Sequence, residues 1–186
     1  MFTAQRLITP TETVENPVVL VEDGRILEIA PRTARAVPAG ALDFGDRILG
    51  PGYIDLHIHG SAGYDVMSDA AEALPAVEQL LTRHGVTSYY PTTVTAPMNA
   101  TLHALERLAG AIEKREHRNG HEAARACPLG IHLEGPFISH ARRGVHPPEN
   151  LLQPTLAAFE RFWQAADRSG ESGSGIGGGH RAGKET

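Results

Sequence analysis

The sequence predicts an α/β protein in which a parallel sheet is covered by helices on its outside. From Pro51 onward, short runs of β-branched and aromatic residues alternate three times with longer segments of helical periodicity, and such an alternation is typical of βα units. Residues 1–50 differ, because they contain only short strand-like runs joined by turns. A chain of 186 residues with 41% hydrophobic residues can form one ordinary domain and a small appendage.

The first fifty residues have the pattern of a few short β-strands. Val18–Val21 is a β-branched run, Glu22–Arg25 has the composition of a hairpin turn, and Ile26–Ile29 follows as a second strand. Ile48–Leu49 forms a further short strand. Since this segment is too short to make a β domain alone, we expect it to pair with another part of the protein.

Three βα units follow Pro51. The expected strands cover residues 53–59, 87–95 and 129–133, and the expected helices cover residues 70–84, 98–118 and 154–166. Apolar residues recur at helical spacing in the helices, as at Leu74, Val77 and Leu81. Three units are too few to complete a barrel or a doubly wound sheet. Residues 168–186 are dominated by Gly, Ser and charge, and we expect this tail to be disordered.

Composition argues against several classes of partner. The formal net charge is −5 and no basic run contains interleaved aromatic residues, so we expect no binding to nucleic acid. No apolar run approaches the ~20 residues that span a bilayer, and the N-terminus lacks the pattern of a secretory signal. Cys127 is the only cysteine, which favours a reducing compartment. We therefore expect a cytoplasmic protein with no membrane partner.

The first strand of the sheet carries a pair of histidines. Side chains alternate across a strand, so in PGYIDLHIHG the side chains of Asp55, His57 and His59 share one face, and the apolar residues between them share the other. Imidazoles at positions i and i+2 can both reach one divalent cation. The alternative is a pair of hydrogen-bonded histidines at the end of the sheet. We expect Asp55 to support the site from behind rather than to bind the cation.

The third strand repeats this arrangement at its end. In PLGIHLEGP, His132 and Glu134 share one face, and Gly135–Pro136 stops the strand. A carboxylate there can bind a metal that the histidines of the first strand hold, and its alternative partner is Arg142 or Arg143 in the following loop. We expect His132 to be packed and hydrogen-bonded behind the ligands. Because two strands present His or Glu at the same end, a metal site is the favoured interpretation, with water of lowered pKa as its nucleophile.

Three motifs resemble the amidohydrolase superfamily and, within it, the N-acetylglucosamine-6-phosphate deacetylases. They are PGYIDLHIHG, HGVTSYYPTTVT and LGIHLEGPFISHARRGVHPPEN, and the resemblance runs from about Val18 to about Ala166. It implies an incomplete (β/α)8 TIM-type barrel, of which residues 51–167 supply the first three βα units. Residues 1–50 would be the N-terminal part of a small β-sandwich. Residues 168–186 do not share the resemblance.

The resemblance also implies roles for individual residues. Glu134 matches the metal-ligand glutamate of the family, and His57 and His59 match positions that help to hold a second metal. Val145 and His146 match positions that contact the sugar. The implied reaction is the metal-dependent hydrolysis of N-acetylglucosamine 6-phosphate to glucosamine 6-phosphate and acetate, in a homodimer. Zinc is the expected cation, and iron or manganese would suit the same ligands.

The sequence departs from this family in its length. Family members are roughly twice as long, and their two further metal-binding histidines, their catalytic aspartate and their phosphate-binding arginine have no counterpart in these 186 residues. We therefore assign no catalytic residue and expect no deacetylase activity from this chain alone. Two alternatives stay open: an amidohydrolase that acts on a cyclic amide such as a dihydropyrimidine, and a non-catalytic fragment that binds a metal or a partner chain.

Overall fold

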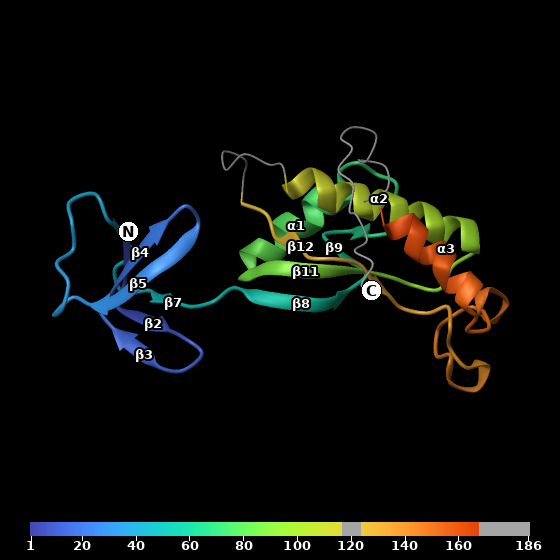
Figure 1. Ribbon diagram of the computed structural model, residues 1–186, viewed down its shortest axis with the longest axis horizontal. Helices are drawn as coiled ribbons and strands as arrows, with labels where there is room; N and C mark the ends of the chain where they lie inside the picture. Colours follow the sequence, from blue (N-terminus) through green and yellow to red (C-terminus); the bar gives the residue numbers. More distant parts are fainter. Residues whose placement is uncertain (117–123, 168–186) are drawn as a thin grey trace, which may run out of the picture. The chain divides into compact units, whose positions relative to one another are not determined.

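The computed structural model describes residues 1–116 and 124–167 and divides the chain into two compact units (Figure 1). The first unit is Met1–Gly52, and the second begins at Tyr53. The tail for which disorder is expected, residues 168–186, lies outside the described residues. Within the described part of the chain, no helix is both long and apolar enough to cross a membrane.

The first unit consists of two small sheets. Their strand orders are β5-β4-β1-β6 and β3-β2-β7. The strands are β1 Phe2–Thr3, β2 Arg6–Ile8, β3 Thr13–Glu15, β4 Pro17–Glu22, β5 Arg25–Pro31, β6 Leu42–Asp43 and β7 Ile48–Leu49. Thr3, Val18 and Val19 are buried in this unit. The short strands expected from the sequence are therefore present, and their place in a β-sandwich stays a prediction.

The hairpin expected at Glu22–Arg25 joins β4 to β5. These two strands pair antiparallel, and the backbone φ angles of Asp23 and Gly24 between them are 49° and 74°. Two successive positive φ angles are what a two-residue hairpin turn of type I′ requires, and the Asp-Gly pair is favoured there for that reason.

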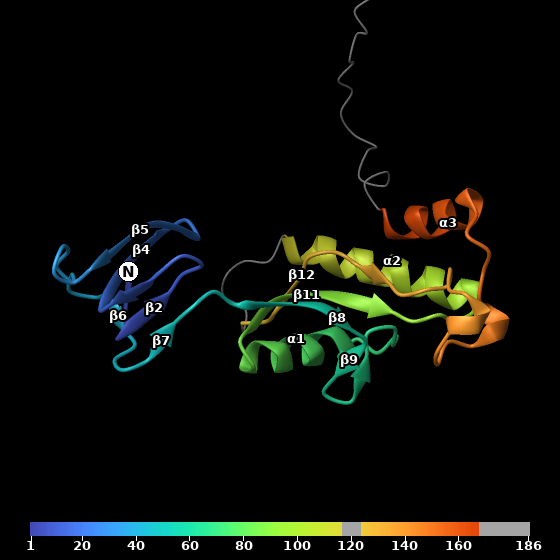
Figure 2. The same ribbon diagram turned by 90° about the horizontal axis from the view of Figure 1, so that it is seen from below.

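The second unit contains the three βα units that the sequence predicts (Figures 1 and 2). They are β8 Tyr53–Ile58 with α1 Ala73–Arg83, β11 Val86–Thr93 with α2 Met98–Glu116, and the pair β12 Cys127–Pro128 and β13 His132–Leu133 with α3 Leu156–Ala166. Strands β8, β12 and β13 all pair parallel with β11, which is therefore the middle strand. Helices α1 and α2 both contact β11, and α3 packs on α2.

The third strand departs from the sequence prediction because it is interrupted. Of the segment expected as one strand, residues 129–133, only His132–Leu133 forms a strand, β13, and β12 lies just before the segment. The two short strands pair with different parts of β11. The Tyr90 ring lies at the interruption, where a Cβ on Gly130 would be 3.1 Å from a ring carbon. The N–H of Leu129 still donates a 2.9 Å hydrogen bond to the carbonyl oxygen of Tyr89, and its side chain is half exposed.

Short elements occupy the connections of the second unit. A small hairpin of β9 Gly60–Ser61 and β10 Tyr64–Asp65 follows β8, and the loop after β13 contains two single-turn 3-10 helices, η1 His140–Arg142 and η2 Pro148–Asn150. The sequence analysis does not predict these elements, because two-residue strands and single turns carry no periodicity. They lie between the strand ends and the helices that follow them.

Three apolar clusters form the core of the second unit. The residues that they bury are Val77, Leu81, Tyr89 and Ala126 in the first, Val66, Leu74 and Leu108 in the second, and Leu105, Phe162 and Ala165 in the third. The clusters join α1 and α2 to the sheet and α3 to α2. This packing accounts for the helical spacing of apolar residues from which α1 is predicted.

Two faces that the sequence marks as apolar are exposed instead. On β8, Ile54 and Leu56 are 56% and 66% exposed, and only Ile58 reaches the core. Helix α1 contacts β9, β10 and β11, so it leaves these two side chains uncovered. On α3, Phe162 is buried, whereas Phe159 and Trp163, which recur with it at helical spacing, are exposed. Helix α3 thus packs through a narrower face than its sequence suggests.

Candidate metal centre

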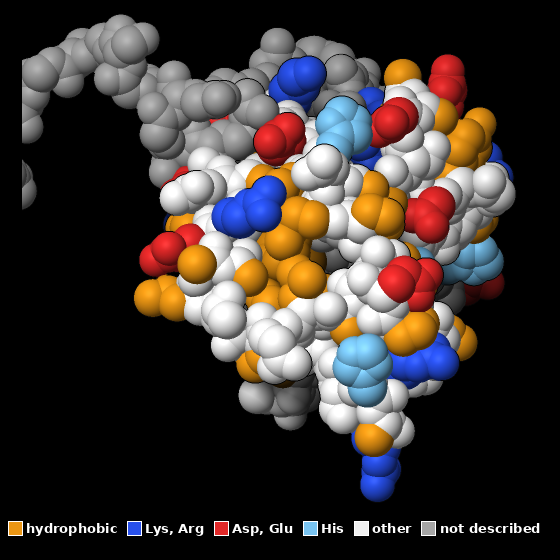
Figure 3. All heavy atoms as spheres, turned by 90° about the vertical axis from the view of Figure 1, so that its right-hand side faces the viewer, with side chains coloured by type: hydrophobic (Ala, Val, Ile, Leu, Met, Phe, Trp, Pro, Cys, Tyr) orange, Lys and Arg blue, Asp and Glu red, His pale blue; other side chains and the backbone are white. Residues whose placement is uncertain are grey.

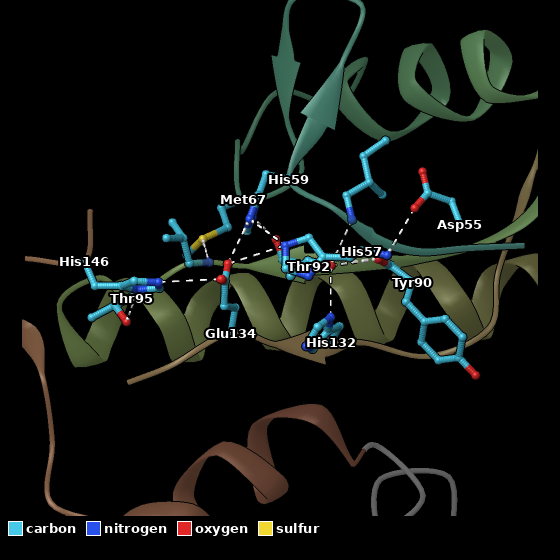
Figure 4. Close-up of polar contacts among 12 residues, drawn as sticks. Asp55, His57, His59, Met67, Tyr90, Thr92, Thr95, His132, Glu134 and His146 are labelled. Atoms are coloured by element: carbon cyan, nitrogen blue, oxygen red, sulfur yellow. Dashed lines mark hydrogen bonds and ion pairs between the residues drawn. The ribbon is translucent and has the colours of Figure 1, made fainter. Parts of the chain in front are cut away.

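Three side chains selected by the sequence analysis converge at one end of the sheet (Figure 4). His57 belongs to β8, His59 follows β8, and Glu134 follows β13. Because β8 and β13 both run parallel to β11, their C-terminal ends lie at the same edge of the sheet. Each residue offers one ligand atom, and these atoms all lie within 4.8 Å of one another.

The separations between the three ligand atoms suit a single cation. The Nε2 atoms of His57 and His59 are 3.1 Å apart. Glu134 Oε2 lies 2.9 Å from His59 Nε2 and 3.6 Å from His57 Nε2. Ligands of a tetrahedral zinc ion, with bonds of ~2.0–2.1 Å, stand about 3.3 Å apart. The three measured distances bracket that value, so these residues fit one divalent cation.

The hydrogen bond behind His59 decides which of its nitrogens faces this cluster with a lone pair. His59 Nδ1 lies 3.0 Å from the backbone carbonyl oxygen of Thr92. A carbonyl oxygen only accepts, so Nδ1 donates, and neutral His59 carries its lone pair on Nε2. That lone pair points at the Glu134 carboxylate (Figure 4). Such a contact is favourable only with a proton or a cation between the two atoms.

His146 contacts the opposite side of the same carboxylate. Its side chain is buried, with Nε2 3.6 Å from Glu134 Oε1 and Nδ1 2.8 Å from Thr95 Oγ1. Val145, its neighbour, is 90% exposed. The two positions matched to sugar contacts therefore differ, since one lies at the carboxylate and the other in solvent. On the face shown in Figure 3, histidine, charged and hydrophobic side chains lie near one another.

The two residues expected behind the ligands lie in different places. Asp55 Oδ1 accepts a hydrogen bond of 3.1 Å from the backbone N–H of His57, so it supports the chain rather than an imidazole ring. The His132 ring stands edge-on to the His57 ring, with centroids 4.9 Å apart. Its Nδ1 lies 3.5 Å from Thr92 Oγ1. Both residues are outside the group of three convergent ligands.

Among the described residues, neither Arg142 nor Arg143 forms the ion pair with Glu134 that was the alternative to a metal site. Arg143 donates a 2.9 Å hydrogen bond to the carbonyl oxygen of His146. In the described part of the chain, the ion-pair partners of Glu134 are His57, His59 and His146. The Glu134 carboxylate therefore contacts the histidines, whereas Arg143 hydrogen-bonds to the backbone of the loop that carries His146.

Two threonines at the end of β11 belong to the site, although no motif marks them. Thr92 and Thr95 contact His59, His132 and His146, and both threonines are buried. The run TTVT in YYPTTVT contained a usable signal, because polar residues at the end of a central buried strand need partners. Finding those partners required the register of β11 between β8 and β13, which the motif alone does not contain.

Several proteins of known name resemble this chain. It is 36% identical over 159 residues to the N-acetylgalactosamine-6-phosphate deacetylase of Escherichia coli O157:H7. This alignment covers 86% of this chain and 39% of the relative. It is 37% identical over 171 residues to the N-acetylglucosamine-6-phosphate deacetylase of Vibrio furnissii, covering 89% and 40%. The protein of that name from Bacillus subtilis is 31% identical over 163 residues, covering 86% and 40%. The chain thus spans about two fifths of the length of these curated relatives. No family model matches it.

Solved structures with the same fold bear related names. The N-acetyl-D-glucosamine-6-phosphate deacetylase of Mycobacterium smegmatis aligns with a TM-score of 0.74 and 26% identity over 89% of this chain and 43% of that one. The Thermotoga maritima N-acetylglucosamine-6-phosphate deacetylase aligns with a TM-score of 0.65 and 26% identity, over 84% and 38%. Sequence and structure therefore agree on the same group of proteins.

Proposed function

We propose that the second unit carries part of the metal-dependent active site of an N-acetylglucosamine-6-phosphate deacetylase. The reason is that this chain resembles the N-terminal part of these enzymes. The reaction is hydrolysis of the acetamide of N-acetylglucosamine 6-phosphate to glucosamine 6-phosphate and acetate. The observation that carries the proposal is the His59 Nε2 atom, whose lone pair faces Glu134 Oε2 at 2.9 Å. A cation between them explains that geometry.

The residues of this chain would hold the cation and orient groups around it. His57, His59 and Glu134 supply one imidazole or carboxylate atom each, and His146 contacts the remaining oxygen of the carboxylate. A bound divalent cation supplies Lewis acidity that polarises an amide carbonyl and lowers the pKa of water. Zinc is the proposed cation, because imidazole and carboxylate suit it, although iron and manganese accept the same ligands.

A zinc titration of the chain tests this proposal. Replacement of Glu134 by glutamine keeps the size of the side chain and removes its charge. Loss of a residue that only supports a metal ligand costs about 10–100-fold in metal affinity. We therefore expect Glu134→Gln, which changes a ligand itself, to weaken zinc binding at least about tenfold. Competition with a chromophoric chelator measures the affinity. Glu149→Gln is the matched control, because Glu149 is exposed and outside the cluster. Equal affinity of wild type and Glu134→Gln would overturn the proposed centre.

The identity of the sugar has two candidates. The E. coli relative is named for N-acetylgalactosamine 6-phosphate, whereas the Vibrio and Bacillus relatives are named for N-acetylglucosamine 6-phosphate. The two substrates differ in the configuration of one hydroxyl group. A chimera in which residues 1–167 replace the matched segment of the Vibrio enzyme allows both substrates, and dihydrouracil as a cyclic amide, to be compared by initial rates.

The remaining expectations about partners belong to the same proposal. The partner is a small amino-sugar phosphate, and the net charge of −5 disfavours nucleic acid. The homodimer follows from the family resemblance, and the cytoplasmic location follows from the single cysteine and the absence of a signal pattern in the sequence. Sedimentation of the chimera tests the dimer, and zinc binding by the chimera with no hydrolysis of either sugar phosphate would favour the alternative of a non-catalytic metal-binding fragment.

A further inference from the structure

Thr92 lies at the end of the middle strand and touches the segments that carry the histidines on both of its sides (Figure 4). We propose that Thr92 is the positioning residue of the metal centre, because its carbonyl and hydroxyl groups together set the tautomer of His59 and His132 and hold the backbone between His57 and His59. This inference rests on the proposed function. It adds to the proposed metal centre a residue that none of the motifs marks as functional.

The carbonyl group of Thr92 acts on His59 directly. It accepts the 3.0 Å hydrogen bond from Nδ1 and so leaves Nε2 bare toward Glu134. Histidines that bind metals usually donate their other ring N–H to such a group, which orients the ring and makes the ligand nitrogen more basic. The strand that lies between the two ligand segments therefore also prepares one of the ligands.

The hydroxyl group of Thr92 has three hydrogen-bond contacts, and the partner of its single hydrogen can be assigned. It donates to the Tyr90 carbonyl oxygen at 3.1 Å and accepts from the Ile58 N–H at 3.1 Å. Since the only hydrogen goes to Tyr90, the contact of 3.5 Å with His132 Nδ1 requires that nitrogen to be the donor. His132 is thereby held in the same tautomer as His59, with its ring against the His57 ring.

The strand ladder needs this hydroxyl at that position. The register between β8 and β11 shifts between Tyr89 and Pro91, the residue paired with Ile58, so the regular ladder is interrupted there. Irregularities of this kind re-aim side chains and are frequent beside active sites. Here the Thr92 side chain takes over as acceptor for Ile58, the residue between His57 and His59. Because Thr92 has 0% exposure, bulk water does not replace it.

Three variants of the chain separate positioning from ordinary packing. Thr92→Val keeps the shape of the side chain and removes its hydroxyl, whereas Thr92→Ser keeps the hydroxyl. Thr93→Val is the matched control, since Thr93 is equally buried on the same strand and its hydroxyl has no hydrogen-bond partner among the described residues. Circular dichroism and urea unfolding of each chain show whether it folds and how stable it is.

Zinc affinity by chelator competition is the first readout. We expect Thr92→Val to bind zinc 10–100-fold more weakly, the usual effect of losing a group that orients a ligand. We expect Thr92→Ser and Thr93→Val to stay within about threefold of wild type, because both keep the hydroxyl group at position 92 that accepts from the Ile58 N–H and contacts His132. An unchanged affinity of Thr92→Val, or an equal loss in Thr93→Val, would overturn the assignment.

Long-range ¹H–¹⁵N spectra of the metal-free chain are the second readout and need no zinc. We expect the Nδ1–H tautomer for His59 and His132 in wild type, and its loss at His132 in Thr92→Val. The Nε2–H tautomer of His59 in wild type would overturn the assignment, even if Thr92→Val does not fold. Failure of the wild-type chain to bind zinc would instead contradict the proposed function, and the tautomers would still decide the role of Thr92.

Discussion

At the scale of single residues, Gly135 shows how tightly the residues around Glu134 are packed. Its φ angle is +73°, and a Cβ at this position would overlap with Thr95 Oγ1, the atom that contacts His146. The glycine therefore meets two demands at once, a left-handed backbone and the absence of a side chain. The sequence motif EGP shows where the strand stops, and the close approach to Thr95 explains why the residue after Glu134 is glycine.

Replacement of Gly135 by alanine tests this packing. We expect Gly135→Ala to lower the free energy of unfolding and to displace His146. The control is Gly144→Ala, since Gly144 also has positive φ, +57°, but a Cβ added there would have no neighbouring atom within 4 Å. Both variants bear the left-handed strain, so the difference between them measures the clash, about 1–3 kcal/mol for overpacking. Urea unfolding followed by circular dichroism gives both values, and equal values would contradict the clash.

At the scale of elements, the start of α3 is set by its N-cap. The sequence prediction begins this helix at Pro154, whereas the helix begins at Leu156. Thr155 adopts an extended backbone, and its hydroxyl accepts a 3.3 Å hydrogen bond from the Ala158 N–H. A threonine before a helix satisfies one of the free N–H groups of the first turn. The cap therefore moves the helix start past Pro154.

The loss of this cap has a measurable cost. We expect Thr155→Ala to destabilise the second unit by about 1 kcal/mol, the typical cost of replacing a capping threonine by alanine. Thr155→Ser keeps the hydroxyl, and we expect it to restore most of the stability. Thermal and urea unfolding of the three chains provide the comparison. A serine variant as unstable as the alanine variant would show that the threonine methyl group, rather than the cap, is responsible.

At the scale of the whole molecule, the sheet of the second unit leaves apolar side chains uncovered. Within the described residues β8 pairs only with β11, and Ile54 and Leu56 on it are more than half exposed. Helix α3 likewise exposes Leu156 and Trp163. A free strand edge with apolar side chains is a template for pairing with another chain.

This exposure predicts self-association of the purified chain. We expect Leu56→Lys to shift the protein toward monomer, because a charge on an edge strand opposes edge-to-edge pairing. Val145→Lys is the control, since Val145 is 90% exposed but lies in a loop. Sedimentation velocity over a range of protein concentrations measures the effect. Association that responds equally to both substitutions would exclude the β8 edge as its origin.

Catalysis by this chain depends on the groups that its residues bring to the ligand cluster. In the described part of the chain, Glu134 is the only carboxylate of the ligand cluster, and three histidines engage it. A general acid must still protonate the leaving amine, and the cluster offers no second carboxylate for that step. We therefore expect the 186-residue chain to bind zinc without releasing acetate from N-acetylglucosamine 6-phosphate. Turnover near that of the Vibrio enzyme, measured in the same assay, would contradict this.

The sequence by itself determined the elements and the candidate ligands. Alternation marks β8, a run of β-branched and aromatic residues marks β11, and helical spacing marks the three helices, because these are local properties of the chain. The same alternation predicts that His57 and His59 lie together on one face. Local patterns also mislead, as at Leu56, since they record which face is apolar and not whether another element covers it.

Only the tertiary structure decided how the ligands meet and what holds them. Glu134 reaches His59 across β11 because β8 and β13 both pair with that strand, and pairing between distant segments leaves no periodic trace in a sequence. The role of Thr92 likewise depends on a register shift at Pro91. A motif states which groups are available, whereas hydrogen-bond direction, and with it the tautomer of His59, follows from which atoms the fold brings within 3.0 Å.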